Sequence, residues 1–297
     1  MTAWLSGAAT DTGLIREHNE DRYWIDPGRG IFLVVDGLGG HAAGELAAQT
    51  AVEAVRESLG VDAPGSAEDR VRAAITTANN RIFERSQQDS ELAGMACVLT
   101  LALLEADELT IGHVGDSRLY LIWNGAIRKL TSDHSPVGEG EDSGELTELE
   151  AMRHPRRHEI FREVGSHPRT AGDEDFIEIR RCRFRPDAAL LLCTDGLTDH
   201  LTAAQALTIA ETYGGDPEHI SAALVEAANA AGGKDNVTAL FVAGPDFRGR
   251  RAEITAARTS PPRTGGLPSW LTGRMACLTY GVLLGMLLWA LLRATRG

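Results

Sequence analysis

Long apolar runs that end on an acidic residue recur along this chain. The clearest is 31–35, five apolar residues of which three are β-branched, followed at once by Asp36 and Gly37. A run of this length closed by Asp-Gly predicts a buried strand that ends in a tight turn. The next two stretches, 41–59 and 67–88, place apolar residues at helical spacing with polar residues on the opposite face. They predict two helices that pack as one layer.

The period changes at Ala96, where the pattern becomes typical of strands. Four strands are predicted over 97–105, 108–116, 118–125 and 126–131. Because the connections between them are short, neighbouring strands are expected to be antiparallel. Further along, two more strands and two helices are predicted over 188–194, 237–244, 202–213 and 218–231. The pattern as a whole predicts an α+β domain with largely antiparallel sheets.

Residues 135–175 interrupt this pattern with a polar and acidic segment. Glu139, Glu141, Asp142 and Glu145 precede a short helix predicted at 147–153. Connections of this composition lie at the surface, so we expect residues 135–175 to form a flap outside the core, with its acidic part at 139–145.

Composition changes the picture mainly through charge. The chain of 297 residues has a net charge of −13, but residues 247–297 carry eight Arg and one Glu, which leaves residues 1–246 with 21 basic and 41 acidic side chains. An acidic body of this kind disfavours nucleic acid as a partner. The length suits one domain of about 240 residues with an appended segment. Four scattered cysteines lack metal or disulfide spacing and are expected to be thiols in a reducing compartment.

An uncharged stretch near the C-terminus predicts a membrane anchor. Met275 to Leu292 runs for 18 residues without a charge between Arg274 and Arg293. As a helix it would span about 27 Å, close to the thickness of the hydrocarbon core. We predict a domain at 1–246, a flexible linker rich in Arg, Pro and Gly at 247–273, a transmembrane helix at 274–293 and a short tail at 294–297.

The orientation of this anchor is predicted from the charges beside it. Arg258, Arg263 and Arg274 precede the apolar stretch within about 20 residues, whereas Arg293 and Arg296 follow it. The more cationic flank stays on the cytoplasmic side, and the first 15 residues lack the pattern of a signal peptide. We therefore expect a single-pass protein of the inner, cytoplasmic membrane whose domain faces the cytoplasm.

Four aspartates are the main candidates for a functional site. Asp36, Asp116 and Asp195 each end an apolar strand, and Asp235 begins one. A single Asp beside Gly or Asn is commonly a turn residue. In an antiparallel sandwich, however, such strand ends can share one edge, where like charges raise one another's pKa unless a cation is present. Four carboxylates from distant segments therefore favour a bridged divalent-metal site.

The glycine turn after the first strand also fits a dinucleotide-binding fingerprint, Gly37-x-Gly39-x-x-Ala42. Two features exclude this interpretation. Asp36 would repel a pyrophosphate at the first turn, and a second helix follows the first where a Rossmann unit needs a strand.

Five motifs, taken together, resemble the bacterial form of the metal-dependent protein Ser/Thr phosphatases of type 2C. They are Arg16-x-x-Asn19-Glu20-Asp21, DGLGGHAAGE (36–45), HVGDSR (113–118), CTDGLTD (193–199) and GGKDNVT (232–238). The resemblance covers about residues 7–244. It implies a four-layer sandwich in which two antiparallel β-sheets are flanked by helices on both faces.

The resemblance also implies ligands for metal ions. Asp36 would bridge two Mn²⁺ or Mg²⁺ ions, with the carbonyl of Gly37 on one of them, and Asp195 and Asp235 would complete the other. Asp116 would serve a weaker third metal. Oxygen ligands without His or Cys suit Mn²⁺ or Mg²⁺ better than Zn²⁺.

Four further residues have implied roles beside the metals. Arg16 would hold the phosphate of the substrate. Glu20, Asp21 and Asn236 would act on the metal ions from outside the set of direct ligands.

The chain departs from the family pattern at two places. Leu38 stands where many eukaryotic members have the histidine proposed as general acid. We predict that His41, on the same glycine loop, replaces it, the alternative being a histidine that faces solvent at a helix start. Gly94-Met95-Ala96-Cys97 replaces the usual Gly-Met-Gly-Thr, which is expected to change strand packing only.

The predicted activity is hydrolysis of phosphoserine and phosphothreonine in proteins by a water activated between two metal ions, without a phosphoenzyme. The expected partners are phosphorylated proteins, including a cognate Ser/Thr kinase and its substrates at the membrane. The alternatives are a phosphoprotein-binding scaffold that kept the fold and a phosphatase for a sigma-factor regulator. The acidic flap at 139–145 favours basic phosphopeptides unless it is an ordinary exposed loop.

Overall fold

The computed structural model describes residues 4–40, 42–60 and 64–250, and four residues of the C-terminal segment (286, 289, 293 and 294). Ten strands of this described part form two five-stranded antiparallel sheets, in the orders β1-β10-β9-β6-β7 and β2-β3-β4-β5-β8. The strands are β1 (Leu5–Asp11), β2 (Arg22–Asp26), β3 (Ile31–Leu38), β4 (Ala96–Glu105), β5 (Glu108–Val114), β6 (Arg118–Trp123), β7 (Ala126–Lys129), β8 (Glu178–Arg183), β9 (Ala189–Cys193) and β10 (Val237–Ala243).

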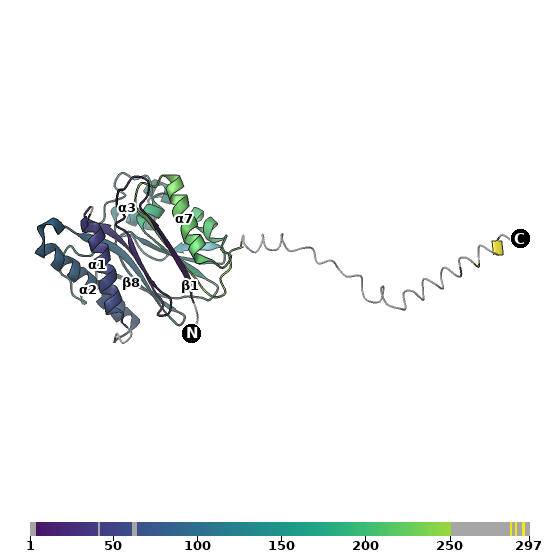
Figure 1. Ribbon diagram of the computed structural model, residues 1–297, viewed down its shortest axis with the longest axis horizontal. Helices are drawn as coiled ribbons and strands as arrows, with labels where there is room; N and C mark the ends of the chain where they lie inside the picture. The colour runs from purple at the N-terminus through teal and green to yellow at the C-terminus, as the bar shows by residue number, and fades with distance from the viewer. Residues whose placement is uncertain are drawn as a thin grey trace. The chain divides into compact units, whose positions relative to one another are not determined.

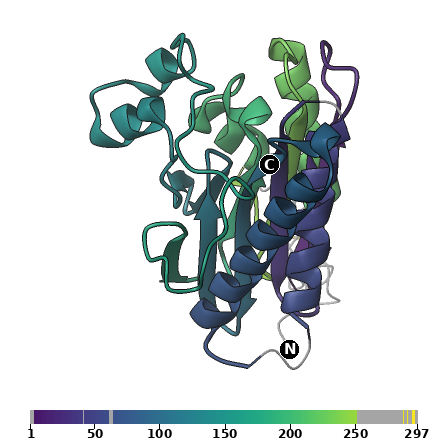
Figure 2. The ribbon, with the colours of Figure 1, turned by 90° about the vertical axis from the view of Figure 1, so that its left-hand side faces the viewer.

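Helices cover the outer face of each sheet (Figure 1). α1 (Ala42–Ser58) and α2 (Ala67–Gln88) lie side by side over the sheet that contains β3 (Figure 2). α6 (Ala203–Ala210) and α7 (Pro217–Ala231) cover the sheet that contains β10. The shorter helices are η1 (Ser90–Leu92), α3 (Pro136–Ser143), α4 (Glu148–Ala151) and α5 (Asp195–Thr198). The predicted four-layer sandwich, with helices on both outer faces, is confirmed.

Strand β3 shows how the apolar pattern builds these layers. Ile31 and Leu33 pack with side chains of α1 and α2, whereas Phe32 and Val34 pack between the two sheets. Successive side chains of a strand point to opposite faces, so a strand buried on both faces is apolar throughout. The same alternation turns the side chain of Asp36 toward the space between the sheets.

Antiparallel pairing brings the strand ends that carry the predicted site residues together at one end of each sheet. The end of β3 pairs with the start of β4, Leu38 opposite Ala96, and the start of β4 lies beside the end of β5. In the other sheet the end of β9 lies beside the starts of β10 and β6, with Cys193 opposite both Ala239 and Arg118. The turns at these ends carry Asp36, Asp116, Asp195 and Asp235.

The folded body continues past the predicted domain boundary at residue 246. Phe247 is only 5% exposed and packs against the rings of Tyr213 and Phe241. The N–H of Gly249 donates to the Tyr213 carbonyl (3.2 Å). The first residues of the predicted linker therefore belong to the body because Phe247 fills a place in its core.

The chain divides into two compact units, Met1–Glu253 and Ile254–Gly297. In the part of the chain that the structure describes, no helix has the length and apolar character needed to span a membrane. Apart from residues 286, 289 and 293, which are helical, the predicted anchor at 274–293 lies outside the described residues, and so does most of the linker.

Candidate active site

A cavity of about 600 Å³ opens where the turns of the two sheets meet. Its walls include eight of the predicted site residues: Arg16, Glu20, Asp36, Gly37, Asp116, Asp195, Asp235 and Asn236. Asp21 is buried close enough for its charge to raise the pKa of Asp36. His41 lies outside the described residues. Arg16 and Asp235, which are 219 positions apart in the sequence, thus share one cavity.

Glycines let the backbone close tightly around Asp36. A Cβ atom on Gly37 would collide with the carbonyl oxygens of Gly44 and Glu20, and one on Gly44 would collide with the Glu20 carboxylate. Gly39 has a φ of +119°, in the region that favours glycine, and turns the chain toward α1. The turn therefore packs the start of α1 directly on the loop that carries Glu20.

The Asn236 amide fixes the loop that carries Arg16 and Glu20. Its Nδ2 donates to the carbonyls of Thr12 (2.9 Å) and His18 (2.8 Å), and its Oδ1 accepts from the N–H of Glu20 (2.8 Å). Each of its polar atoms therefore bonds to the protein. Asn236 holds this loop against the start of β10 through these bonds.

Arg16 reaches the cavity wall from the same loop. Its Nη2 donates to Oδ2 of Asp235 at 2.7 Å, and 49% of its side chain is exposed. The guanidinium lies on the open side of the carboxylates, where a second anion can reach it.

Asp21 is a buried carboxylate in which only one of the two oxygens accepts hydrogen bonds from the described residues. Its Oδ2 accepts from the hydroxyls of Thr238 (2.7 Å) and Thr194 (2.9 Å), whereas its Oδ1 has no hydrogen-bond partner among the described residues. Burial, opposed by these two hydroxyls, raises the pKa of Asp21 to about 7. A buried oxygen that lacks a donor is costly, which indicates a ligand or a water on this side.

The other carboxylates are held against their mutual repulsion. Burial raises the pKa of Asp36 well above its usual range, and the charges of Asp21, Asp195, Asp116 and Asp235 raise it further. Burial and the charge of Asp195 likewise raise the pKa of Asp116. A divalent cation removes this repulsion and prefers such oxygen ligands. The residues present therefore fit a centre of hard cations.

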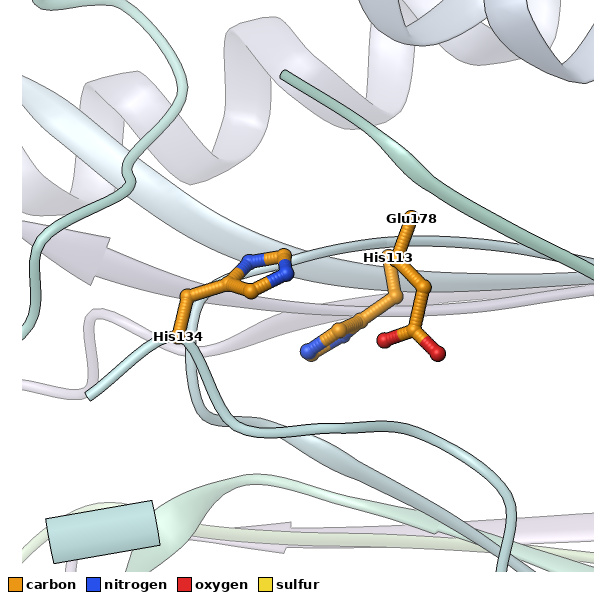
Figure 3. Close-up of side chains that lie close together, drawn as sticks. All are labelled: His113, His134 and Glu178. Atoms are coloured by element: carbon orange, nitrogen blue, oxygen red, sulfur yellow. The ribbon is translucent and has the colours of Figure 1, made fainter. Parts of the chain in front are cut away.

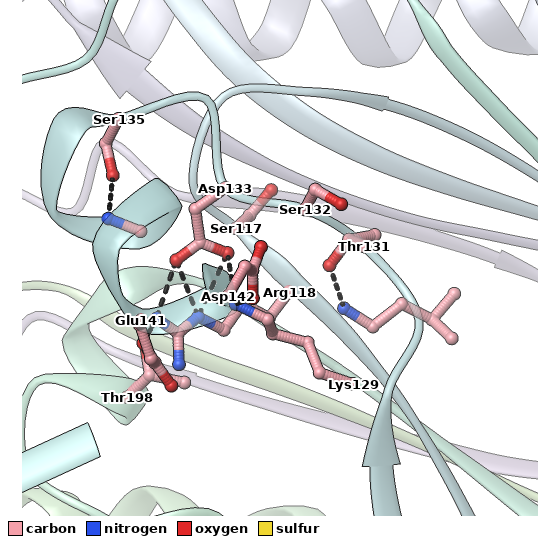
Figure 4. Close-up of polar contacts among 12 residues, drawn as sticks. Ser117, Arg118, Lys129, Thr131, Ser132, Asp133, Ser135, Glu141, Asp142 and Thr198 are labelled. Carbon is pink, nitrogen blue, oxygen red and sulfur yellow. Dashed lines mark hydrogen bonds and ion pairs between the residues drawn. The ribbon is translucent and has the colours of Figure 1, made fainter. Parts of the chain in front are cut away.

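A buried ion-pair network supports the turn that carries Asp116 (Figure 4). Arg118 donates to Oδ2 of Asp133 from Nη2 (2.6 Å) and Nε (2.9 Å), and to Oε2 of Glu141 (2.7 Å). Lys129 pairs with Asp142 at 2.7 Å. The network joins the start of β6 to helix α3, so the flap is tied to the strand that follows Asp116.

Comparisons with known proteins agree with this geometry. The family model of protein phosphatase 2C matches residues 16–226. The serine/threonine phosphatase stp of Listeria welshimeri is 33% identical over 240 residues, which are 78% of this chain and 93% of that protein. The chain belongs to the protein phosphatase 2C family. It is a protein serine/threonine phosphatase, as the sequence predicted.

Two further relatives of this phosphatase bear on its domain and its metals. The protein phosphatase PstP of Mycobacterium tuberculosis is 31% identical over 92% of this chain, which spans about half (51%) of that protein. The crystal structure of the catalytic domain of PstP with two manganese ions superposes with a TM-score of 0.72, at 28% identity, over 82% of this chain and 99% of that domain. The predicted cofactor, Mn²⁺ or Mg²⁺, agrees with the metal of that relative.

The cavity of the phosphatase also contains residues that the sequence did not single out. His158 Nδ1 lies 3.8 Å from Oδ2 of both Asp195 and Asp199, and Arg157 Nε donates to Asp199 at 2.9 Å. Asp199 follows Asp195 by four positions, a spacing that puts both on one side of a helical turn. This spacing could have identified Asp199 from the sequence. No sequence pattern pointed to Arg157 or His158, because both lie in the polar segment 135–175.

His113, His134 and Glu178 form a second group of possible metal ligands (Figure 3), and none of the three lines the active-site cavity. Atoms of His113, His134 and Glu178 lie within 4.8 Å of one another. His113 contacts Thr100 Oγ1 through Nδ1 (2.8 Å) and the Ser132 carbonyl through Nε2 (3.2 Å).

The other two members of this group are bonded to protein as well. His134 Nδ1 accepts from the N–H of Gly115 (3.0 Å), and Glu178 accepts from the N–H of Ser132 (2.9 Å). We therefore interpret the group as a structural cluster that holds the loop 131–134 against β5.

Proposed function

We propose that this phosphatase hydrolyses phosphoserine and phosphothreonine in proteins at a two-metal centre held by Asp36, Gly37, Asp195 and Asp235. The observation that carries the proposal is the convergence of these residues on one cavity together with the raised pKa of Asp36. Asp116, on the same wall, would hold a weaker third ion. When bound, two Mn²⁺ or Mg²⁺ ions supply an activated water and neutralise the phosphoryl oxygens.

The chain's own side chains would orient the substrate. Arg16 has an open guanidinium beside Asp235 and would donate to the oxygens of the phosphoryl group as negative charge builds there. Asn236 keeps that loop in place through its three hydrogen bonds. Asp21 and Glu20 would accept hydrogen bonds from the waters of the centre. The unpartnered Oδ1 of Asp21 points to such a bond.

The test is metal-dependent release of phosphate from a phosphoserine peptide by the full-length protein. Addition of EDTA is expected to abolish it, and Asp195→Asn to lower kcat/KM by more than about 100-fold, the scale of loss when a charge-stabilising group is removed. Asp246→Asn is the matched control, since Asp246 is exposed and follows the far end of β10. Full activity of Asp195→Asn would contradict the assignment. Phosphopeptide binding without hydrolysis would instead support a scaffold.

His41 remains our proposed donor of the proton to the leaving alkoxide. General-acid catalysis contributes about 10²–10⁴-fold. His41→Ala should therefore slow hydrolysis of phosphoserine peptides far more than that of p-nitrophenyl phosphate, whose leaving group needs no proton. Equal losses on both substrates would reject the role.

We further propose that residues 275–292 anchor the protein in the inner membrane with the catalytic domain in the cytoplasm, where it would oppose a Ser/Thr kinase. The uncharged length of the segment and the excess of Arg before it support this topology. The full-length chain should sediment with membranes, and a chain truncated after residue 253 should not. An N-terminal reporter that fluoresces only in the cytoplasm should be bright. Cleavage of the domain by protease added to intact cells would show that the domain faces outward, which would contradict the proposed topology.

A further inference from the structure

A second cavity opens beside the active site. It measures about 520 Å³ and shares four wall residues with the first cavity: Arg157, Asp199, His200 and Lys234. A polypeptide whose phosphorylated side chain enters the first cavity can therefore reach the second with its neighbouring residues. We call the second cavity the side groove.

Two cations in the side groove lack an acidic partner. Arg153 and Lys234 are exposed, and within the described residues neither forms an ion pair or a side-chain hydrogen bond. Residues 1–246 carry 41 acidic side chains, and more than half of the described arginines are paired with one of them. Examples are Arg16, Arg22, Arg29, Arg70, Arg118 and Arg157.

Asp199, the acidic residue among those that line the side groove, is paired with a protein cation. Asp199 accepts from Arg157 at 2.9 Å. In the flap, Glu141 accepts from Arg118 and Asp142 from Lys129, both at 2.7 Å. Two of the four acidic residues at 139–145 are thus paired with protein cations. These two pairs reduce the negative charge that the segment offers to a basic phosphopeptide.

Three apolar residues also line the side groove: Leu149, which is 53% exposed, Met152 and Ala231. An exposed leucine next to unpaired cations suits a chain segment that presents an apolar and an anionic side chain together.

We propose that the side groove binds the substrate chain next to the phosphorylated residue and selects an acidic side chain at that place. The inference rests on the proposed function, because the phosphoryl group must occupy the neighbouring cavity. An extended chain advances about 3.3 Å per residue. The selected acidic residue is therefore expected within about three positions of the phosphoserine.

The experiment compares three phosphoserine peptides that differ only at the neighbouring positions, with Glu, Gln or Lys there. The full-length protein with Mn²⁺ is used, and the measured quantity is the ratio of kcat/KM for the Glu peptide to that for the Gln peptide. An exposed ion pair changes affinity by at most about fivefold, so two cations predict a ratio of roughly 2 to 25 that falls in high salt. The effect should appear in KM rather than in kcat.

Variants separate the side groove from the overall charge of the protein. Arg153→Gln should lower the ratio by up to about fivefold, and Arg153→Glu should shift preference toward the Lys peptide. Arg56→Gln is the matched control. It removes the same charge from the exposed last turn of α1, roughly 21 Å along the helix from its start at the glycine turn.

The outcomes are distinct from those that test the activity itself. A ratio near one in the wild type, with all three peptides hydrolysed, would refute the side groove and leave the phosphatase intact. An equal fall of the ratio in Arg153→Gln and Arg56→Gln would refute it too, because overall charge would then be the cause. Absence of metal-dependent hydrolysis of every peptide would refute the proposed function instead.

Discussion

Replacement of Arg118 by methionine should destabilise the protein strongly at neutral pH. Arg118 and Asp133 are 9% and 5% exposed, and three Arg118 N–H···O contacts of 2.6–3.1 Å join the two side chains. Glu141 accepts from the same guanidinium at 2.7 Å. Removing one partner of a buried ion pair costs about 3–5 kcal/mol, and the cation that remains, Lys129, lies farther from Asp133, at 3.4 Å.

Linkage gives an independent magnitude for the same change. In the wild type, burial alone would raise the pKa of Asp133, but the charges of Arg118 and Lys129 lower it below its usual value. Without Arg118, burial would outweigh the more distant charge of Lys129 and raise the pKa of Asp133 above its usual value, so that the carboxyl takes up a proton in the folded state. An unfolded Asp titrates near pH 3.9, so keeping it neutral at pH 7 costs up to about 4 kcal/mol, at 1.36 kcal/mol per pH unit.

The pH dependence follows from the direction of the shift. A carboxylate whose folded pKa is lowered stabilises fully above its unfolded value and loses this effect as the pH falls through the folded value. The gap between the wild type and Arg118→Met should therefore be largest at pH 7 and shrink toward pH 4. A second change, Asp133→Asn, should recover part of the loss at pH 7.

Equilibrium urea unfolding of the full-length protein, followed by tryptophan fluorescence at pH 7, 5.5 and 4, measures these differences. Arg128→Met is the control, because Arg128 is an exposed residue of β7 and such changes stay within about 0.5 kcal/mol. A loss below about 1 kcal/mol at pH 7, or one that does not change with pH, would refute the reasoning.

Three further changes probe the site and its supports. Gly37→Ala should destabilise the protein by about 1–3 kcal/mol and weaken Mn²⁺ binding, because the added methyl collides with the Gly44 carbonyl; unchanged melting temperature and Mn²⁺ affinity would speak against the packed turn. Asn236→Ala removes three hydrogen bonds that hold the loop of Arg16. The KM for phosphopeptides should therefore rise by about tenfold, which corresponds to about 1.4 kcal/mol. Proteolysis of that loop should also become faster, and an unchanged digestion rate would contradict this prediction. Burial raises the pKa of the Cys193 thiol to about 12, so iodoacetamide at pH 8 should leave phosphatase activity intact with Cys193 unmodified on peptide mapping; rapid inactivation would imply a cysteine in the chemistry.

Most of the strands that the sequence revealed lie inside their sheets; the exception is the predicted strand at 126–131, which is the edge strand β7. β3, β4, β9 and β10 sit inside their sheets and consist mainly of apolar residues. β1, β2 and β8 were not predicted, and all three are edge strands. An edge strand contacts only one neighbour and exposes more polar side chains, as in the segment EIRRCR of β8. Its apolar signal is therefore too weak to separate it from a loop.

Some residues of the site could be predicted from the sequence and others could not. The acidic residues at strand ends were found because each ligand position borders a local apolar run and a glycine or asparagine, as at Asp36 and Asp195. Arg157 and His158 reach the cavity from a flap whose position depends on the ion pairs of Arg118 and Arg157 with distant residues. No local pattern encodes such contacts, so these two residues became visible only in the fold.

Titration of Mn²⁺ into the metal-free, full-length protein by calorimetry tests the central claim most directly. The wild type should bind at least two ions, and Asp36→Asn should lose both tight sites together, because one carboxylate is proposed to bridge them. Asp246→Asn, with the same loss of charge at a distance from the cavity, should bind as the wild type does. Two tight ions retained in Asp36→Asn, or no binding by the wild type, would contradict the two-metal centre.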